Sequence, residues 1–311
     1  MLAIGPALAS DRLVVDDAGR KVQVPQAPKR IVVLHEAALG VPIAELGIAP
    51  VGSYGRDDQG ASLLTVDFYK IVLAGSAPKP LPRGIGAIGN MDLERLRALS
   101  PDLIIGTEHN VDRARQLSKI APVYLQNSST GRVRGNESQE ALSRLLKRTK
   151  EFTALKRSYA QRVKTVRDAL PHNPNGKTYL GIFITDQINL IGEMSGLVQA
   201  FQDLGYTRLD VSGIGAIKGF GSALLVPISP EVFASLNPDL LVMMNSYGKP
   251  QREEAHIRQN LDRIIPGWAR FLKPARDGRI IFLDSAKVTT PSFASANHTL
   301  DAVRAWASHQ K

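Results

Sequence analysis

Two stretches of the chain share one pattern of polar and hydrophobic residues. Glu94 is followed by six residues and then by Pro101-Asp102-Leu103, and Glu231 is followed by six residues and then by Pro238-Asp239-Leu240. Each stretch predicts a short helix that ends before the proline, because proline cannot continue a helix and disfavours helical geometry in the residue before it. The apolar run that follows lacks alternation, which is typical of a parallel strand covered on both faces. The repeat predicts two related α/β halves, each with one glutamate at the same place.

The rest of the pattern supports the duplication. A hairpin is expected over residues 13–24, and a terminal helix over 296–308. Helices at 37–46 and 197–204 are each closed by a glycine, Gly47 and Gly205. Gly47 and Gly205 are separated by the same distance along the chain as Leu125 and Leu283. Buried strands are predicted at 31–34, 51–53, 103–105 and 123–125 in the first half, and at 179–184, 240–243 and 280–283 in the second.

A long amphipathic segment separates the two halves. Between Glu137 and Leu170, apolar residues recur mainly every three or four positions, and no glycine or proline interrupts them. This predicts one helix of about 50 Å, which would act as a rigid strut. A coiled coil is the alternative, but the segment has no sustained heptad. The predicted fold is therefore α/β, with two Rossmann-like lobes of parallel-rich sheet (10–136 and 172–311) joined by one interlobe helix (137–171).

Composition narrows the possible functions. The 311 residues include no cysteine, which excludes thiolate catalysis, cysteine-ligated zinc and disulfides. The formal net charge is +10, but the basic residues are scattered, mostly on predicted helices, and few aromatic residues interleave with them. We interpret them as a solvated helix surface rather than a nucleic-acid interface. An anionic small ligand is also consistent with this charge.

The first nine residues resemble part of an export signal. Leu2 to Leu8 is short and mostly apolar, and Ala7-Leu8-Ala9 has the small-residue pattern of a signal-peptidase site. We therefore expect residues 1–9 to be the remnant of a signal peptide and the protein to be exported.

The motifs that could carry catalysis are incomplete. Gly84-Ile-Gly86-Ala-Ile-Gly89 has the letters of a dinucleotide fingerprint, but a proline-rich loop precedes it instead of a strand. A similar sequence, 213–218, stands in a loop of the second half, so we interpret the two as rim loops, one per lobe. There is no Gly-x-Ser-x-Gly elbow, and the histidines lack the spacing His-Glu-x-x-His. His35 and His109 follow strands, and with an acid such as Asp186 or Asp284 they could bind a metal.

Candidate ligand contacts stand after the ends of the predicted strands, where open α/β sheets bind ligands. Arginine and lysine there could bind anionic oxygens, and tyrosine and phenylalanine could form flat apolar walls. In the first lobe the candidates are His35, the loop Tyr54-Gly55-Arg56, Arg83 and His109. In the second they are Asp186, Lys218, Phe220, Asn245, Tyr247 and Lys287.

The order of the motifs resembles a known family. The first features of this order are the two lobes, the strut and the repeated Glu-x6-Pro-Asp pattern. Five sequence segments add to them: residues 16–25, residues 28–34, Leu46-Gly-Ile-Ala-Pro-Val-Gly52, Ile120-Ala-Pro-Val123 and Gly278-Arg279. Together they resemble the periplasmic binding proteins of ABC importers for ferric siderophores and cobalamin. The resemblance covers nearly the whole chain after residue 9.

The resemblance implies a role for each part of the molecule. The chain would be a monomeric, non-enzymatic periplasmic receptor without a cofactor, and it would not bind nucleic acid. It would hold an Fe(III)–siderophore between its lobes through residues drawn from His35, Arg56, Arg83, His109, Lys218, Phe220 and Tyr247. Glu94 and Glu231 would dock onto arginines of the permease dimer. Paired acid–base catalysis by these two carboxylates is not expected, because it would require them within several ångströms of each other and a long strut separates the lobes.

One departure from the family pattern concerns the ligand. Hydroxamate binders often carry an arginine shortly before the first-lobe glutamate, whereas 86–90 here reads Gly-Ala-Ile-Gly-Asn. Arg83 or Arg56 could replace it, and the citrate and catecholate classes stay open. A receptor for haem, cobalamin, zinc or manganese is the alternative, followed by a two-lobed nucleotide-dependent enzyme.

Overall fold

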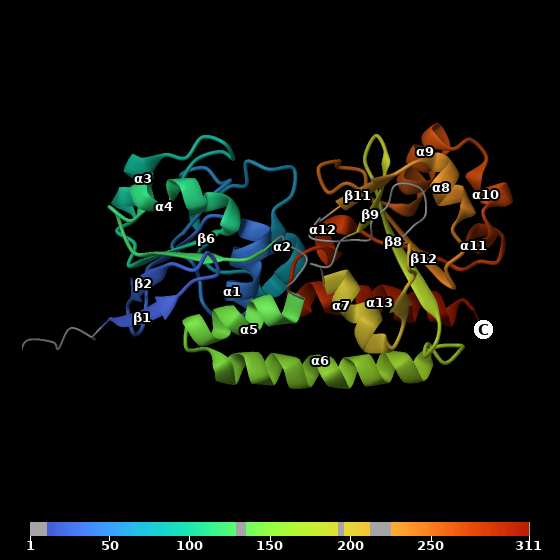
Figure 1. Cartoon of the computed structure of the whole chain (residues 1–311), viewed down its shortest axis with the longest axis horizontal. Helices are drawn as coiled ribbons and strands as arrows, with labels where there is room; N and C mark the ends of the chain where they lie inside the picture. The colour runs from blue at the N-terminus through green and yellow to red at the C-terminus, as the bar shows by residue number, and fades with distance from the viewer. Residues whose placement is uncertain (1–10, 129–134, 192–195, 212–224, 311) are drawn as a thin grey trace, which may run out of the picture.

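The computed structural model describes residues 11–128, 135–191, 196–211 and 225–310. Two α/β lobes lie side by side, an N-terminal lobe (11–128) and a C-terminal lobe (172–310), and helices run beneath both of them (Figure 1). These helices are α5 (Gly135–Leu145), α6 (Thr149–Ala169) and α13 (Phe293–Ser308).

The N-terminal lobe contains a five-stranded parallel sheet in the order β5-β4-β3-β6-β7. An antiparallel hairpin of β1 (Arg12–Val15) and β2 (Lys21–Val24) precedes it, as predicted. The sheet strands are β3 (Ile31–Val33), β4 (Gly52–Ser53), β5 (Arg83–Gly84), β6 (Leu103–Thr107) and β7 (Val123–Gln126). The helices are η1 (Glu36–Gly40), α1 (Val41–Glu45), α2 (Phe68–Leu73), η2 (Ala74–Ser76), α3 (Leu93–Ala98), η3 (Glu108–Asn110) and α4 (Val111–Leu117).

The C-terminal lobe has a six-stranded mixed sheet in the order β11-β9-β8-β12-β13, with β10 also paired to β8. The pairs that β8 makes with β10 and β12 are parallel, as is the pair β12–β13, whereas β9 and β11 are antiparallel. The strands are β8 (Thr178–Ile184), β9 (Ile188–Ile191), β10 (Thr207–Arg208), β11 (Leu225–Ile228), β12 (Leu240–Asn245) and β13 (Ile280–Phe282). The helices are α7 (Gly196–Leu204), α8 (Pro230–Ser235), α9 (Glu254–Ile264), α10 (Trp268–Phe271), α11 (Lys273–Arg276) and α12 (Ser285–Val288).

The aspartate of the repeated Pro-Asp motif has the same structural role in both lobes. The carboxylate of Asp102 accepts the backbone N–H groups of Lys29 and Arg30, at 2.7 and 2.9 Å, just before β3. The carboxylate of Asp239 accepts the backbone N–H and the hydroxyl of Thr178, at 2.8 and 3.0 Å, at the start of β8. Each aspartate thus ties the strand that follows it to the neighbouring parallel strand.

The strand register agrees with this equivalence. Leu103 lies opposite Ile31, and Leu240 lies opposite Tyr179, so the residue after each aspartate pairs at the same place. The glycines that close the preceding helices, Gly47 and Gly205, both have positive φ, at 80° and 104°. Glycine takes this left-handed conformation without a steric penalty. The duplication predicted from the sequence is confirmed.

The predicted single helix over 137–171 is instead two helices. After α5, Lys147 turns to a φ of 55°, and the N–H of Arg148 bonds back to the carbonyl of Ser143 at 2.7 Å. Figure 1 shows α5 and α6 running in opposite directions as a helical hairpin. The apolar spacing continues through the turn because both helices face the same core, so periodicity alone gave no sign of the break. The 21 residues of α6 span about 31 Å.

One hydrophobic core extends through both lobes. It joins Ile43 of α1, Leu142 of α5, Tyr159 of α6 and Phe201 of α7 around Phe293 at the start of α13. The ring of Phe293 lies 5.2 Å from that of Tyr159, centroid to centroid. A second cluster joins the apolar side chains of α2 to Ala286 of α12. Relative motion of the lobes would have to shear these close-packed contacts, which favours small displacements over a wide hinge opening.

A polar junction lies within the same interface. Gln139 of α5 donates to the carboxylate of Glu45 at 2.8 Å and to the carbonyl of Pro42 at 3.1 Å. Glu45 also accepts the backbone N–H groups of Phe293 and Ala294, so it joins α1 of one lobe to α13 of the other. Burial is the main cause that raises the pKa of Glu45 to about 7.

Replacing Phe293 with alanine is expected to destabilise the whole protein by about 3–5 kcal/mol, since a buried aromatic ring would leave a cavity at the junction of the lobes. Phe271→Ala is the matched control, because the Phe271 side chain is 47% exposed. Denaturant unfolding measures both changes. Equal, small effects of the two substitutions would contradict the shared core.

The pH dependence of stability should reveal Glu45. Because its folded-state pKa is raised, the folded protein binds the proton more tightly than the unfolded chain. Its stabilising contribution is therefore present below about pH 4.5 and is lost as the pH rises through about 7. Between pH 5 and 8, the free energy of unfolding of the wild type should fall by up to about 3 kcal/mol more than that of the Glu45→Gln variant. Thermal unfolding across this range tests it, with the exposed Glu254→Gln as control. Parallel curves for all three proteins would refute the assignment.

Candidate functional site

Two predicted histidines stand at adjacent strand ends of the N-terminal lobe. His35 follows β3, and its Nδ1 accepts the backbone N–H of Ala38 at 3.1 Å, which caps the next helix. His109 follows β6 within η3. Part of the His35 side chain is open to solvent. Burial of the rest is the main cause that lowers the pKa of His35, and the charge of His109 lowers it further, whereas Glu108 acts to raise it. His35 is therefore a neutral imidazole at neutral pH.

Among the described residues, no further acid or histidine joins these two histidines to complete a metal centre. No group of three or more His, Asp and Glu side chains is placed to hold a metal among the residues that the structure describes. Asp284, one of the acids considered for such a site, is bonded to Arg252 instead. The described residues thus do not support a receptor for free zinc or manganese.

Tyr247 lies where the two lobes meet. It follows β12 of the C-terminal lobe, and its ring makes edge contacts with Phe183 of β8 at 5.8 Å and with Phe68 of α2 at 5.6 Å. The backbone N–H of Phe68 donates in turn to Glu36, the neighbour of His35, at 2.9 Å. Tyr247 is still 44% exposed, and burial of the rest of the ring raises the pKa of its hydroxyl. The strand ends of both lobes therefore converge around α2.

Arg56 is held inside the N-terminal lobe rather than presented to a ligand. Its side chain is fully buried, and its Nε and Nη2 donate to both carboxylate oxygens of Glu36 at 2.6 and 2.9 Å. Nη2 also donates to Asp67 at 2.6 Å, and Nη1 donates to the carbonyl of Gly60 at 2.6 Å. The guanidinium lies over the ring of Tyr69, 5.0 Å from its centroid. Arg56 thus connects its own loop to η1 and α2.

The buried network places one guanidinium between two carboxylates, and the exposed Lys70 pairs with Asp67 at 3.5 Å. Burial acts to raise the pKa of Asp67, but hydrogen bonds and charge from Arg56 outweigh it, and the pKa lies below its usual value. Burial raises the pKa of Glu36, although Arg56 opposes this. Removing one member would leave a buried charge uncompensated, which is strongly destabilising.

The other predicted contacts are not brought to this place. Arg83 lies on the edge strand β5 and pairs with Asp58 at 2.7 Å, both side chains being largely exposed. Lys218 and Phe220 lie outside the described residues.

The glycine-rich loop has a packing explanation. A Cβ on Gly84 would lie 1.8 Å from the carbonyl oxygen of Arg56, and one on Gly86 would lie 2.3 Å from that of Asn90. The helix that follows, α3, is capped by Asp92, which accepts the N–H groups of Glu94 and Arg95 at 3.0 Å. A carboxylate of the chain itself thus occupies the place that a nucleotide phosphate would take.

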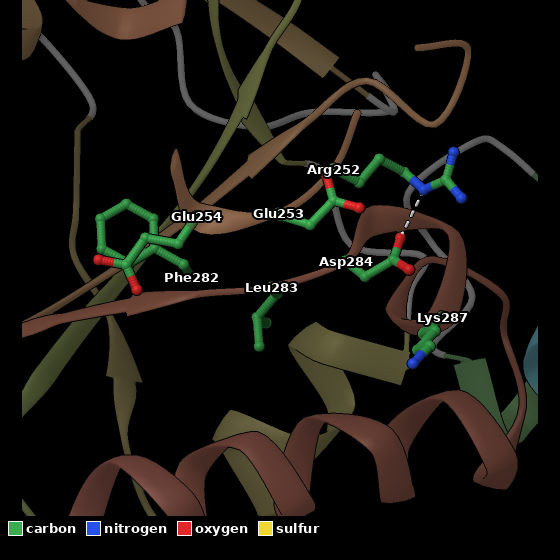
Figure 2. Close-up of a pocket in the computed structure, with 7 residues that line it drawn as sticks. All are labelled: Arg252, Glu253, Glu254, Phe282, Leu283, Asp284 and Lys287. Atoms are coloured by element: carbon green, nitrogen blue, oxygen red, sulfur yellow. Dashed lines mark hydrogen bonds and ion pairs between the residues drawn. The ribbon is translucent and has the colours of Figure 1, made fainter. Parts of the chain in front are cut away.

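A charged recess of about 350 Å³ lies at the end of β13 in the C-terminal lobe. Arg252 donates to the Asp284 carboxylate at 2.7 Å and to the carbonyl of Lys249 at 2.8 Å. Figure 2 shows the cationic ends of Arg252 and Lys287 on the same side of the recess as Asp284, while Glu254 lies toward the other end. Lys287 is exposed, and its ammonium forms no ion pair within the described part of the chain.

Sequence reasoning missed Arg252 and Phe68. Arg252 stands in a loop without a pattern, seven residues after β12, so its distance from the strand end concealed it. Phe68 begins a short amphipathic helix and resembled an ordinary core residue. Neither residue carries a local signal, since each acquires its neighbours from another segment of the chain.

Glu94 and Glu231 occupy equivalent, exposed positions. Each lies in the first turn of a six-residue helix, α3 or α8, whose N-cap is Asp92 or Ser229. Glu94 is 84% exposed and pairs only with Arg97 of the same helix among the described residues. A hydrogen bond with Ser229 lowers the pKa of Glu231, which is therefore ionised at neutral pH. In Figure 1, α3 and α8 lie on the upper side of their lobes, opposite α6.

Within the residues that the structure describes, no helix combines the length and apolar character needed to cross a membrane.

Known proteins share this architecture. The sequence is 23% identical to the ferric-anguibactin-binding protein FatB of Vibrio anguillarum over 230 residues, which cover 70% of this chain and 67% of FatB. The petrobactin-binding protein YclQ of Bacillus subtilis superposes with a TM-score of 0.69 at 17% identity, covering 96% of this chain and 99% of YclQ.

A further solved structure is FeuA of Bacillus subtilis, a triscatecholate siderophore-binding protein complexed with ferri-bacillibactin. Its TM-score is 0.69 at 16% identity, over 96% of this chain and 98% of FeuA. At these identities the solved structures establish the fold, two lobes with parallel-rich sheets. Residues 64–286, well over half of the chain, match the family model described as periplasmic binding protein. The chain therefore belongs to the periplasmic binding protein family.

Proposed function

We propose that this protein is an exported receptor that binds a ferric siderophore between its lobes and delivers it to an ABC importer. The observation that carries the proposal is the contact of Tyr247 with Phe68, which brings the strand ends of the two lobes together within a member of the periplasmic binding protein family. The names of FatB, YclQ and FeuA support iron chelates as the ligand class.

Cationic, aromatic and imidazole groups near the strand ends of the two lobes suit an anionic chelate with flat apolar parts. Arg252 and Lys287 supply cationic donors to carboxylate, catecholate or hydroxamate oxygen. The exposed part of Tyr247 supplies a ring face and a hydroxyl donor, and neutral His35 supplies a further polar group. The proposal is for binding and release without chemistry, as expected of a binding-protein family.

The core shared by the lobes supports a particular manner of binding. Since the core extends through α5, α6 and α13, ligand binding is accompanied by small adjustments of loops and side chains. A preformed site loses little conformational entropy on binding, which favours high affinity.

Lys287→Ala is expected to weaken the binding of an anionic ferric chelate by roughly tenfold, because an ionic hydrogen bond contributes on the order of 1.5–3 kcal/mol. Lys119→Ala, which removes the same charge after α4 of the other lobe, should leave the affinity unchanged. Quenching of tryptophan fluorescence during titration with ferric hydroxamate, catecholate and citrate complexes measures the affinities. Binding of haem or cobalamin but of no ferric chelate would refute the ligand class.

Delivery is proposed to proceed through Glu94 and Glu231. Their equal placement at the start of equivalent helices presents two negative charges on the same side of a rigid body, which supports docking in one orientation onto arginines of a permease dimer. The exposed pair between Glu94 and Arg97 contributes little energy, so it can exchange for an intermolecular pair.

The double variant Glu94→Lys, Glu231→Lys should keep its affinity for the chelate but support at least about tenfold slower uptake, because like charges at a docking surface repel. The control is Asp112→Lys with Asp168→Lys, which changes the net charge equally at exposed sites outside α3 and α8. Uptake of radiolabelled ferric chelate by cells and chelate affinity in vitro are measured together. Loss of chelate affinity in the glutamate variant would show that these residues support the binding site instead.

A further inference from the structure

Most of the net charge of this protein is concentrated in one segment, which comprises the end of α5, the turn after it and α6. Residues 144–168 contain nine lysines and arginines but only two acidic residues, Glu151 and Asp168. This segment therefore carries seven of the ten net positive charges of the chain, and the rest of the sequence is close to neutral. The surplus belongs to α6 and the turn before it rather than to the proposed ligand site.

Four cations of α6 form one basic surface. Lys150, Arg157 and Lys164 recur every seven residues, which places them on one face at spacings of about 10 Å. Lys156 is exposed beside Arg157. We call these four residues the basic ridge.

The acidic residues nearby do not neutralise the ridge. Glu151 is engaged by Arg148 at 2.9 Å, and Asp168 pairs with Lys164 at 2.7 Å. Lys150, Lys156 and Arg157 form no ion pair within the part of the chain that the structure describes. Three of the four cations are thus available to a partner.

The surface between the cations is accessible. Thr149, Thr153 and Ala154 line a recess of about 340 Å³ together with Lys150 and Arg157. The short side chains let an anionic group approach both cations. No large apolar side chain is exposed on α6 among the described residues, so a partner would be held by charge and not by insertion.

The helix that carries the ridge lies on the opposite side of the molecule from the proposed docking surface. Figure 1 shows α6 along the lower edge of the molecule beneath both lobes, whereas α3 and α8, which carry Glu94 and Glu231, lie on the upper side. A protein docked through these glutamates cannot present the ridge to the same membrane.

We propose that the basic ridge binds the surface of an anionic phospholipid membrane. Its cations are spread along a straight helix of about 31 Å instead of converging on one point, so they match many phosphate groups on a flat surface better than one small ligand. The absence of exposed aromatic side chains on the described α6 disfavours single-stranded nucleic acid, which is bound through stacking as well as charge.

This inference goes beyond the proposed function and adds a stage before docking. The free receptor is concentrated at the membrane through the ridge, and it turns over to dock through α3 and α8. Binding to lipid and docking on the permease exclude each other on one membrane, and the lipid contact is weakened by salt.

Sedimentation with phosphatidylglycerol vesicles and with phosphatidylcholine vesicles tests the proposal. The wild type should bind the anionic vesicles and not the neutral ones, with an affinity that falls as salt is raised. A triple variant should weaken this binding by on the order of 100-fold; it combines Lys150→Glu, Lys156→Glu and Arg157→Glu. These side chains are exposed, and an unchanged melting temperature and chelate affinity confirm that the variant is folded.

The matched control reverses three exposed cations on and after α4, Arg113→Glu, Arg115→Glu and Lys119→Glu, and produces the same net charge. It should retain vesicle binding. Equal loss in both triple variants would overturn the proposal, because net charge rather than the ridge would then govern binding. Equal binding to phosphatidylcholine, failure of the wild type to bind anionic vesicles, or tighter binding to a DNA oligonucleotide at the same salt would overturn it as well.

Discussion

The packing of Phe293 between the two lobes is the contact on which the rest of the structure depends. Its ring lies against Phe152 and Tyr159 of α6, and the backbone at the start of α13 donates to Glu45 of α1. A sheet in each lobe is thereby attached to one continuous core. Since this interior is close-packed, the lobes keep one relative placement, and groups carried by different sheets can form a single site.

The proposed site follows from that placement. Open parallel sheets bind ligands at the carboxyl ends of their strands. Here α2 lies between the carboxyl ends of β3 and β12 and connects them. The buried ion pairs of Arg56 with Glu36 and Asp67 hold α2 in position, and Phe68 at its start touches Tyr247. A fully buried arginine is therefore connected to the site without reaching the ligand.

The distribution of charge distinguishes three surfaces on one rigid body. Carboxylates on α3 and α8 lie on one side, the cations of Arg252 and Lys287 border the recess in the C-terminal lobe, and the basic ridge occupies the opposite edge. Net charge alone could not distinguish these surfaces, because seven of the ten net positive charges come from residues 144–168, which include the ridge. Long-range attraction and repulsion therefore depend on orientation, which is how a charged protein can use different faces in succession.

The sequence by itself determined the duplication, the buried strands, the glycine-closed helices and the matched positions of Glu94 and Glu231. These features obey short-range rules of proline, glycine and apolar period, which act within a few residues. Tertiary structure decided the break at Lys147, the burial of Arg56 and the neighbours of Phe68 and Arg252. The same apolar spacing suits one helix or two that face a common core, and the same arginine suits a ligand or a buried carboxylate. Local stereochemistry permits both alternatives in each case, so only the packing of segments that are distant in the sequence decides which one forms.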